Sequence, residues 1–256
     1  MTSRYRVSLG GVHLDTLDDH LLILDVQYSP VEKQDKTSTV GGLDGYDMEN
    51  TYYSRRTVTV SFELHIYDTA KRNAACQKVN AWAQGGGNLR VNDRENQFLE
   101  VECEQLAEIG SVRNWTDPLT LVFTTTGIPF WRSNDAKTVT VSGTNASGTL
   151  KMDGNTQYAY VLVTATARAK VTSFRAIVGD TEIKLTGLNI PSGKKIEIDY
   201  VHGRYLRIRG NGSSVMKKLD PASSDRLLAA CGQNVTVSAK SDANMNTEFV
   251  ARGLWL

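Results

Sequence analysis

The residue types that usually carry chemistry are few in this chain and lie far apart. The four histidines are His13, His20, His65 and His202, and none forms an H-E-x-x-H pair or stands at ligand spacing from a cysteine. The sequence has no G-x-S-x-G nucleophile elbow, and GNGSS at 210–214 lacks the strand–turn–helix frame of a phosphate loop. We therefore predict no catalytic residue, no cofactor and no metal site, and expect that the protein is not an enzyme.

The cysteines indicate free thiols. Cys76, Cys103 and Cys231 have no C-x-x-C spacing, and an odd number cannot complete a disulfide framework. We expect buried thiols in a reducing compartment. The sequence MTSRYRVSLG resembles no signal peptide, and no apolar run approaches the ~18 residues of a membrane span. These features predict a soluble protein that is made in a cytoplasm and has no membrane span.

Three carboxylates share one face of a predicted strand at Phe98–Leu106. Glu100, Glu102 and Glu104 alternate there with Leu99, Val101 and Cys103. Successive side chains of a strand point to opposite faces, so this strand has an apolar face and an acidic face.

The elements that hold this strand are also strands. In Thr57–Tyr67, every second residue from Val58 to Ile66 is apolar, which predicts a strand with one buried face. Shorter runs of the same kind occur at Leu21–Tyr28 and Leu119–Thr125. The first half of the chain is therefore predicted to be mostly strands.

One helix interrupts these strands, over about residues 69–84. Asp68 is a good N-cap, because its carboxylate can accept backbone N–H groups of the first turn. Apolar residues follow at helical spacing, with Trp82 as the expected main anchor, and three glycines at 85–87 end the helix.

A polar, glycine-rich segment at 29–56 separates two of the strands. We predict a long loop there. Loops of this length inside a domain are usually functional or disordered. A binding arm or assembly loop and a disordered excursion are both consistent with the sequence.

The second half contains many short strands divided by turns, which is typical of a β-sandwich. The apolar cluster Ile128, Phe130 and Trp131 around Pro129 predicts a packed hinge, which gives domains at 1–131 and 132–256. The segment Asp220–Leu228 favours one helical turn.

The net charge of +1 hides an asymmetry between the halves. Residues 1–130 carry 12 Lys and Arg against 18 Asp and Glu, a net of −6, and residues 131–256 carry 17 against 10, a net of +7. A nearly neutral chain is unlike a polybasic nucleic-acid binder, and we predict no sequence-specific nucleic-acid binding. The split suggests two units with different surroundings.

The order and spacing of these segments resemble the distal tail protein (Dit) family of long-tailed, non-contractile bacteriophages. The residues that carry the resemblance are Phe62–Gly87, Phe98–Leu106, Leu119–Trp131, Leu219–Ala239 and Glu248–Leu256. The family implies a tail-tube-like N-terminal β-sandwich with one helix, followed by a galectin-like or carbohydrate-binding-module-like β-sandwich.

The resemblance also implies a role and partners. Members form a homo-oligomeric ring, expected to be a hexamer, that joins the tail tube protein to the tail-tip hub and lets DNA pass at ejection. A receptor-binding protein or a cell-wall glycan is a further expected partner. The protein is then a virion component of the tail tip.

Two hypotheses about residues follow from this resemblance. An acidic channel wall repels DNA phosphates, so Glu100, Glu102 and Glu104 are candidate channel-lining residues; the alternative is that they face the ring exterior or a neighbouring subunit. The loop at 29–56 is long enough to reach a neighbouring subunit, with these candidate contact residues: Lys33, Asp35, Lys36, Tyr46 and Asp47.

Two other classes of function stay open from the sequence. The chain could be a carbohydrate-binding adhesion module, with saturable glycan binding by the second domain. It could also be a hydrolase with a site assembled from distant residues, although no cluster of titratable groups in the sequence indicates one.

Overall fold

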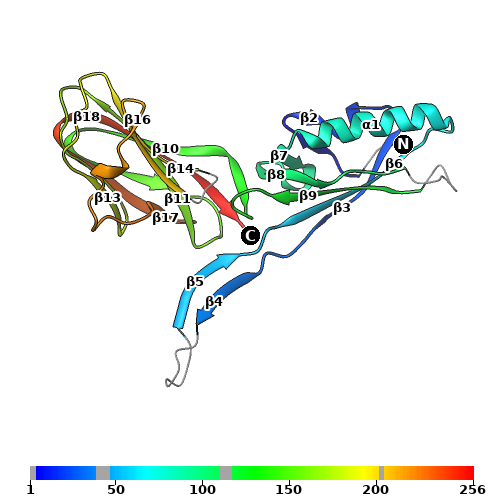
Figure 1. The fold of residues 1–256 in the computed structure, drawn as a ribbon, viewed down its shortest axis with the longest axis horizontal. Coiled ribbons are helices and arrows are strands. Elements are labelled where there is room, and N and C mark those ends of the chain that lie inside the picture. The colour runs from blue at the N-terminus through cyan, green and yellow to red at the C-terminus, as the bar shows by residue number, and fades with distance from the viewer. Residues whose placement is uncertain (1–3, 39–46, 110–116, 202–204) are drawn as a thin grey trace. The chain divides into compact units, whose positions relative to one another are not determined.

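The chain divides into two units, Met1–Phe130 and Trp131–Leu256. The computed structural model describes residues 4–38, 47–109, 117–201 and 205–256, and at 35–38 and 47–52 it describes the backbone alone. Strands dominate both units, and one α-helix is present in the described part (Figure 1). The prediction of a mainly β protein is therefore confirmed. No helix in these ranges is long and apolar enough to cross a membrane.

Seven strands of the first unit form one antiparallel sheet in the order β3-β6-β9-β8-β7-β1-β2. Their bounds are β1 (Val7–Leu9), β2 (Val12–His13), β3 (Leu21–Tyr28), β6 (Thr57–Leu64), β7 (Gly87–Val91), β8 (Gln97–Gln105) and β9 (Leu119–Thr125). Two short 3-10 helices, Leu14–Thr16 and Asn92–Arg94, lie between them.

Strand β6 lies inside this sheet, between β3 and β9, and its pattern explains the core. Val58, Val60, Phe62 and Leu64 are all fully buried, while the residues between them are half-buried. The period-two prediction is confirmed to Leu64. The strand ends there rather than at Tyr67, which is 78% exposed.

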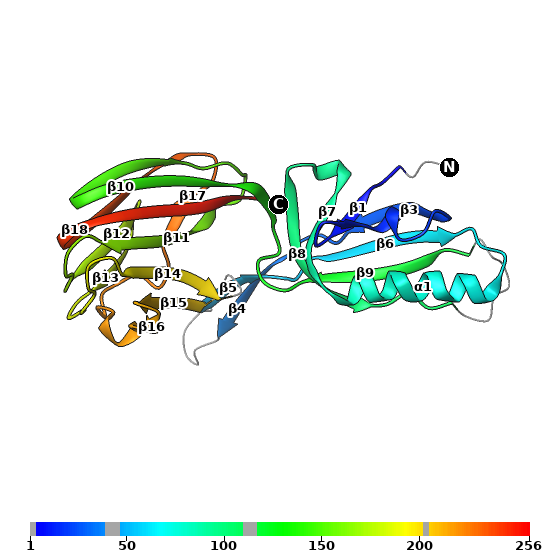
Figure 2. The ribbon, with the colours of Figure 1, turned by 90° about the horizontal axis from the view of Figure 1, so that it is seen from above.

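Helix α1 (Thr69–Gln84) covers this sheet (Figure 2). Asp68 caps it, since its carboxylate accepts a 3.0 Å hydrogen bond from the Lys71 N–H. The buried face is made mostly of small residues, Ala75, Val79 and Ala83 among them. Trp82 is half-buried: its ring lies edge-on to the fully buried Phe123 with centroids 6.1 Å apart, and its indole N–H donates to the Val12 carbonyl at 3.0 Å. After the helix, Gly86 has φ +56°, where a Cβ would lie 3.0 Å from the Val101 carbonyl oxygen.

The segment expected to be a long loop contains two strands, so that prediction is corrected. Strands β4 (Lys33–Ser38) and β5 (Asp47–Tyr53) pair with each other antiparallel and with no other described strand. We call them the arm (Figure 1). Their sequences, KQDKTS and DMENTYY, have no apolar alternation. Without a buried face there is no period-two signal to read, which is why the strands escape prediction.

The second unit is built around one very long antiparallel pair, β10 (Trp131–Lys151) and β18 (Asn234–Trp255). The other strands are β11 (Tyr158–Ala167), β12 (Phe174–Val178), β13 (Thr181–Leu185), β14 (Lys195–Val201), β15 (Tyr205–Gly210), β16 (Ser213–Ser214) and β17 (Leu228–Ala230). The sequence predicts two separate short strands, at Asn234–Ala239 and Thr247–Ala251, where β18 is continuous. The turn-like residues between them lie where the register shifts within the β10–β18 pair.

Strand β18 serves two sets of partners, because its Val237–Ser241 half pairs with β12 and its Met245–Ala251 half pairs with β11. Phe174 of β12 and Phe249 of β18 are 1% and 0% exposed and belong to the core. The predicted helical turn at Asp220–Leu228 is wrong: the 3-10 helix lies earlier, at Met216–Lys218. Asp220 instead accepts the Ala222 N–H and pairs with Lys184, which holds the segment as a turn.

Candidate functional site

Strand β8 places the three predicted carboxylates at different degrees of exposure. Leu99 and Val101 are 0% and 2% exposed, so the alternating side chains of Glu100 and Glu102 lie on the opposite face. Glu102 is exposed and forms a 3.5 Å ion pair with Arg55, and Glu100 is half-buried. Exposed Glu104 lies at a register shift between Cys103 and Gln105. The alternation of acidic and apolar side chains is therefore regular from Leu99 to Glu102 and is interrupted by the register shift at Glu104.

These carboxylates do not form a metal centre. Among the residues that the structure describes, no group of three His, Cys, Asp or Glu side chains is arranged to hold a metal ion. His65, expected to be solvated, is half-buried and lies 2.7 Å from the Glu63 carboxylate through Nε2. His202 lies outside the described residues.

All three cysteines are free, but the expectation that they are buried holds only for Cys76. Burial raises the pKa of the Cys76 thiol, as it does for the half-buried Cys103. Raised thiol pKa values keep sulfur in its protonated, less reactive form. Burial thus disfavours the reactive thiolate form at Cys76 and Cys103.

The arm is fastened to the sheet by a closed neck. Glu32 and Ser54 bond in both directions, N–H to hydroxyl and N–H to carbonyl, each at 2.8 Å. Ser29 and Thr57 repeat this reciprocal pairing at 2.7 and 2.9 Å. At the end of the arm nearest the neck, the Tyr53 ring lies edge-on to Phe130 with centroids 4.9 Å apart.

The candidate contact residues of this segment lie along the arm. Lys33 is exposed and opposite Tyr53 in the register. The backbone of Asp35 and Lys36 lies in β4, and that of Asp47 begins β5. Tyr46 lies outside the described residues. The structure thus places four of the five on one two-stranded ribbon.

Arg56, immediately after the neck, is a functional candidate that the sequence interpretation missed. Only 6% of the residue is exposed, and its Nε has no hydrogen-bond partner among the described residues. Its backbone is fixed by Thr125, which accepts the Arg56 N–H and donates its own N–H to the Arg56 carbonyl, both at 3.0 Å. Alternation along the strand could have indicated this burial, because Arg56 stands two residues before buried Val58 and its side chain is on the same face.

The surroundings of Arg56 are cationic. Burial, together with the nearby positive charge of Arg94, lowers the pKa of Arg56. Arg94 lies over the ring of Tyr28, 5.7 Å from its centroid. The Tyr28 hydroxyl donates to the Asp93 carboxylate at 2.9 Å, and burial, then this bond, raises the pKa of Tyr28. Asp93 is thus engaged by Tyr28, and no ion pair to Arg56 is found in the described ranges.

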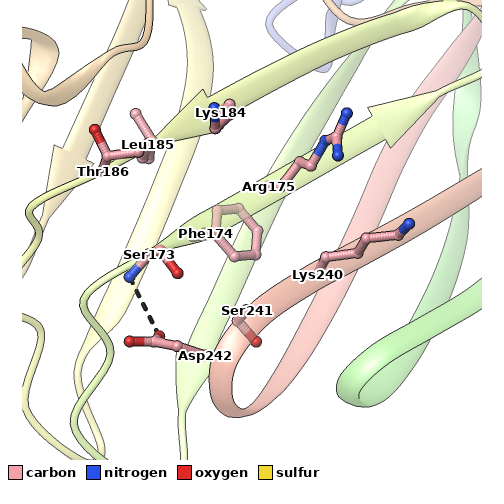
Figure 3. A pocket seen from close by; sticks show the side chains of 9 residues that line it. All are labelled: Ser173, Phe174, Arg175, Lys184, Leu185, Thr186, Lys240, Ser241 and Asp242. Atoms are coloured by element: carbon pink, nitrogen blue, oxygen red, sulfur yellow. Dashed lines mark hydrogen bonds between the residues drawn. The ribbon is translucent and has the colours of Figure 1, made fainter.

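A shallow concavity of about 290 Å³ lies on the second unit (Figure 3). Lys240, Arg175 and Lys184 form one cross-strand row beside it, since they are register partners on β18, β12 and β13. Arg175 pairs with Glu182, and Lys184 pairs with Asp220 at 2.8 Å. The row is therefore largely neutralised by the unit's own carboxylates.

The rest of this concavity is internally bonded as well. Asp242 accepts hydrogen bonds from the Thr172 hydroxyl and from the N–H groups of Thr172 and Ser173, at 3.0 and 3.2 Å. Phe174, the lining aromatic residue, is 1% exposed and presents no ring face. A concavity whose charges are paired and whose ring is hidden does not by itself indicate a ligand.

Comparison with known proteins gives a match of fold. Neither a protein-family model nor a curated protein matches this chain. Among solved structures, it is similar to the SPP1 Dit protein, described as a paradigm of the hub adsorption apparatus in phages that infect Gram-positive bacteria. The TM-score is 0.68 at 15% identity, over 97% of this chain and 98% of that one.

The chain has a Dit-like fold. The resemblance read from the sequence is thus confirmed at the level of structure. The phage P2 baseplate in its activated conformation with Ca is also similar, with a TM-score of 0.47 at 10% identity over 99% of this chain and 98% of that one. The Dit-like fold runs through both units, since the SPP1 match covers nearly the whole of each chain.

Proposed function

We propose that this chain is a structural, non-catalytic subunit of a phage tail tip, which forms a ring between the tail tube protein and the tail-tip hub. The observation that carries the proposal is the Dit-like fold over nearly the full length of both chains. The protein is made in the host cytoplasm and ends in the virion. The ring is expected to be hexameric, with DNA passing through it at ejection.

The acidic balance of the first unit supports a place for it around the channel. A wall that repels phosphates lets DNA slide, whereas a cationic wall would bind it through counterion release. In this proposal Glu100, Glu102 and Glu104 line the channel. Glu102 is exposed on the face of β8 opposite Leu99 and Val101, and Glu104 is exposed at the register shift, as lining side chains must be.

The arm supports the proposal of assembly. A lone two-stranded hairpin is marginally stable in water, and both of its edges carry unpaired backbone groups. Docking on a neighbouring copy would pair an edge and bury part of its surface. Lys33, Asp35, Lys36, Tyr46 and Asp47 are the proposed contact residues.

The test is the state of the purified chain. Size-exclusion chromatography with light scattering should show a discrete oligomer, and imaging should show rings with a central opening. A chain that stays monomeric at every accessible concentration would contradict the ring. In the assembled structure, β8 glutamates farther than about 15 Å from the lumen, two Debye lengths at physiological salt, would contradict the channel assignment alone.

A further inference from the structure

Arg56 presents a physical problem in the single chain. Removing a guanidinium from water costs several kcal/mol, and buried charges in proteins are therefore paired. Arg56 is 6% exposed, its Nε is enclosed without a partner in the described ranges, and no carboxylate there forms an ion pair with it. The single chain thus contains a largely buried guanidinium with no ion-pair partner in the described ranges.

The nearest groups do not resolve this problem. Arg94 adds a second positive charge, and the Asp93 carboxylate bonds the Tyr28 hydroxyl at 2.9 and 3.0 Å rather than Arg56. Thr125 forms hydrogen bonds with the backbone N–H and carbonyl of Arg56, and neither bond involves the guanidinium. Arg56 and Arg94 thus place two positive charges near one another, and no carboxylate pairs with Arg56 in the described ranges.

Its position connects it to the arm. Arg56 follows directly after Ser54 and Arg55, where the arm's neck closes, and precedes strand β6. Arg55 differs from it, because its side chain is 57% exposed and pairs with Glu102 at 3.5 Å. Two adjacent arginines at one neck thus have opposite environments, one paired at the surface and one buried without a counter-charge.

We propose that Arg56 is an intersubunit receptor for a carboxylate of a second copy of this chain, filled when the arm docks on its neighbour. The inference rests on the ring proposed above. A second copy is the occupant that charge favours, because residues 1–130 carry 18 acidic against 12 basic side chains. A guanidinium suits the role, since its planar fork can donate two parallel hydrogen bonds to one carboxylate.

The experiment compares the full-length wild type with Arg56→Met, Arg56→Lys and the matched control Arg55→Met. Association is measured by light scattering across a concentration series at low and high salt, and the melting temperature of each dilute monomer is recorded. Arg56→Met should weaken association at least about tenfold, because buried interfacial charge pairs contribute strongly. Its monomer should melt at or above the wild-type temperature, since an unpaired desolvated charge has been removed.

The remaining variants identify the interaction. Arg56→Lys should fall between Arg56→Met and wild type, because it keeps the charge and loses the fork. Arg55→Met should assemble like wild type. Wild-type association should weaken with salt more steeply than that of Arg56→Met.

Two outcomes would overturn the inference. Assembly of Arg56→Met at wild-type strength would do so while leaving the ring intact. A destabilised Arg56→Met monomer whose association keeps the wild-type salt dependence would assign Arg56 a purely structural role. A wild type that never associates is a separate result, since it removes the ring proposal first.

Discussion

The two units differ in how they satisfy their own charges and edges. In the second unit, Arg175 pairs with Glu182, Lys184 with Asp220, and Arg207 with Asp199. In the first, the two-stranded arm has open edges and Arg56 lacks a counter-charge within the described residues. These three cations of the second unit thus find their counter-charges within the same unit, whereas Arg56 does not in the described residues. Assembly should therefore depend on the first unit.

Removing the arm gives the largest expected effect on this contrast. The reciprocal bonds of Glu32 and Ser54 close the neck, so Lys33–Tyr53 can be replaced by a short glycine-containing turn without opening the sheet. The variant should lose oligomer formation and keep a folded monomer, because the arm contributes no core residue in its described part. Light scattering with circular dichroism checks both results. Oligomers of wild-type size after the replacement would place assembly elsewhere.

Core truncations should separate the two units in stability. Phe62 in β6 and Phe249 in β18 are both 0% exposed, so Phe62→Ala and Phe249→Ala should each cost about 3–5 kcal/mol. If the units unfold independently, each variant lowers one of two unfolding transitions and leaves the other unchanged. Differential scanning calorimetry on the full chain makes the measurement, and each variant is the control for the other. A single transition shifted equally by both would show that the units unfold together.

The sequence was most informative where burial imposes a period. Val58, Val60 and Phe62 alternate with polar residues and reveal β6, and Asp68 with the glycines after Gln84 marks both ends of α1. The arm is a strand pair with no apolar face, so its sequence shows no period-two pattern that would predict strands. A long strand such as β18 is divided in the sequence by polar residues at a register shift, and only pairing with β10 shows it to be continuous.

The candidate site was less predictable than the fold. The acidic face of β8 could be read from alternation, but the counter-ion Arg55 of Glu102 comes from a segment 47 residues away. Because Arg56 stands two residues before buried Val58, the sequence places its side chain on the buried face. The same spacing does not show whether a carboxylate lies beside it. The charges around Arg56 are set by residues from other elements, among them Tyr28 and its partner Asp93. Long-range electrostatics is thus the part that requires three dimensions.

The smallest expected effect is a pH dependence of the second unit's stability that comes from Asp242, a carboxylate hydrogen-bonded within that unit. Burial alone would raise the pKa of Asp242, but hydrogen bonds from Thr172 and Ser173 outweigh it, and the pKa is lowered below its usual range. A lowered folded-state pKa gives stability that is present above the unfolded value of about 4 and is lost as pH falls through the folded one. Wild type should therefore exceed Asp242→Asn in stability most at neutral pH, with the difference shrinking in acid.

Chemical denaturation at several pH values below and above 4 measures this difference in the second unit. Asp225→Asn is the control, because the Asp225 side chain is 83% exposed and pairs only with neighbouring Arg226 at 3.3 Å. It should change stability little at any pH, as exposed ion pairs contribute little. A difference between wild type and Asp242→Asn that stays constant down to strong acid would mean that the Asp242 oxygens act as neutral acceptors. The negative charge of Asp242 would then add little to the stability of the second unit, and the contrast with the first unit would not extend to this carboxylate.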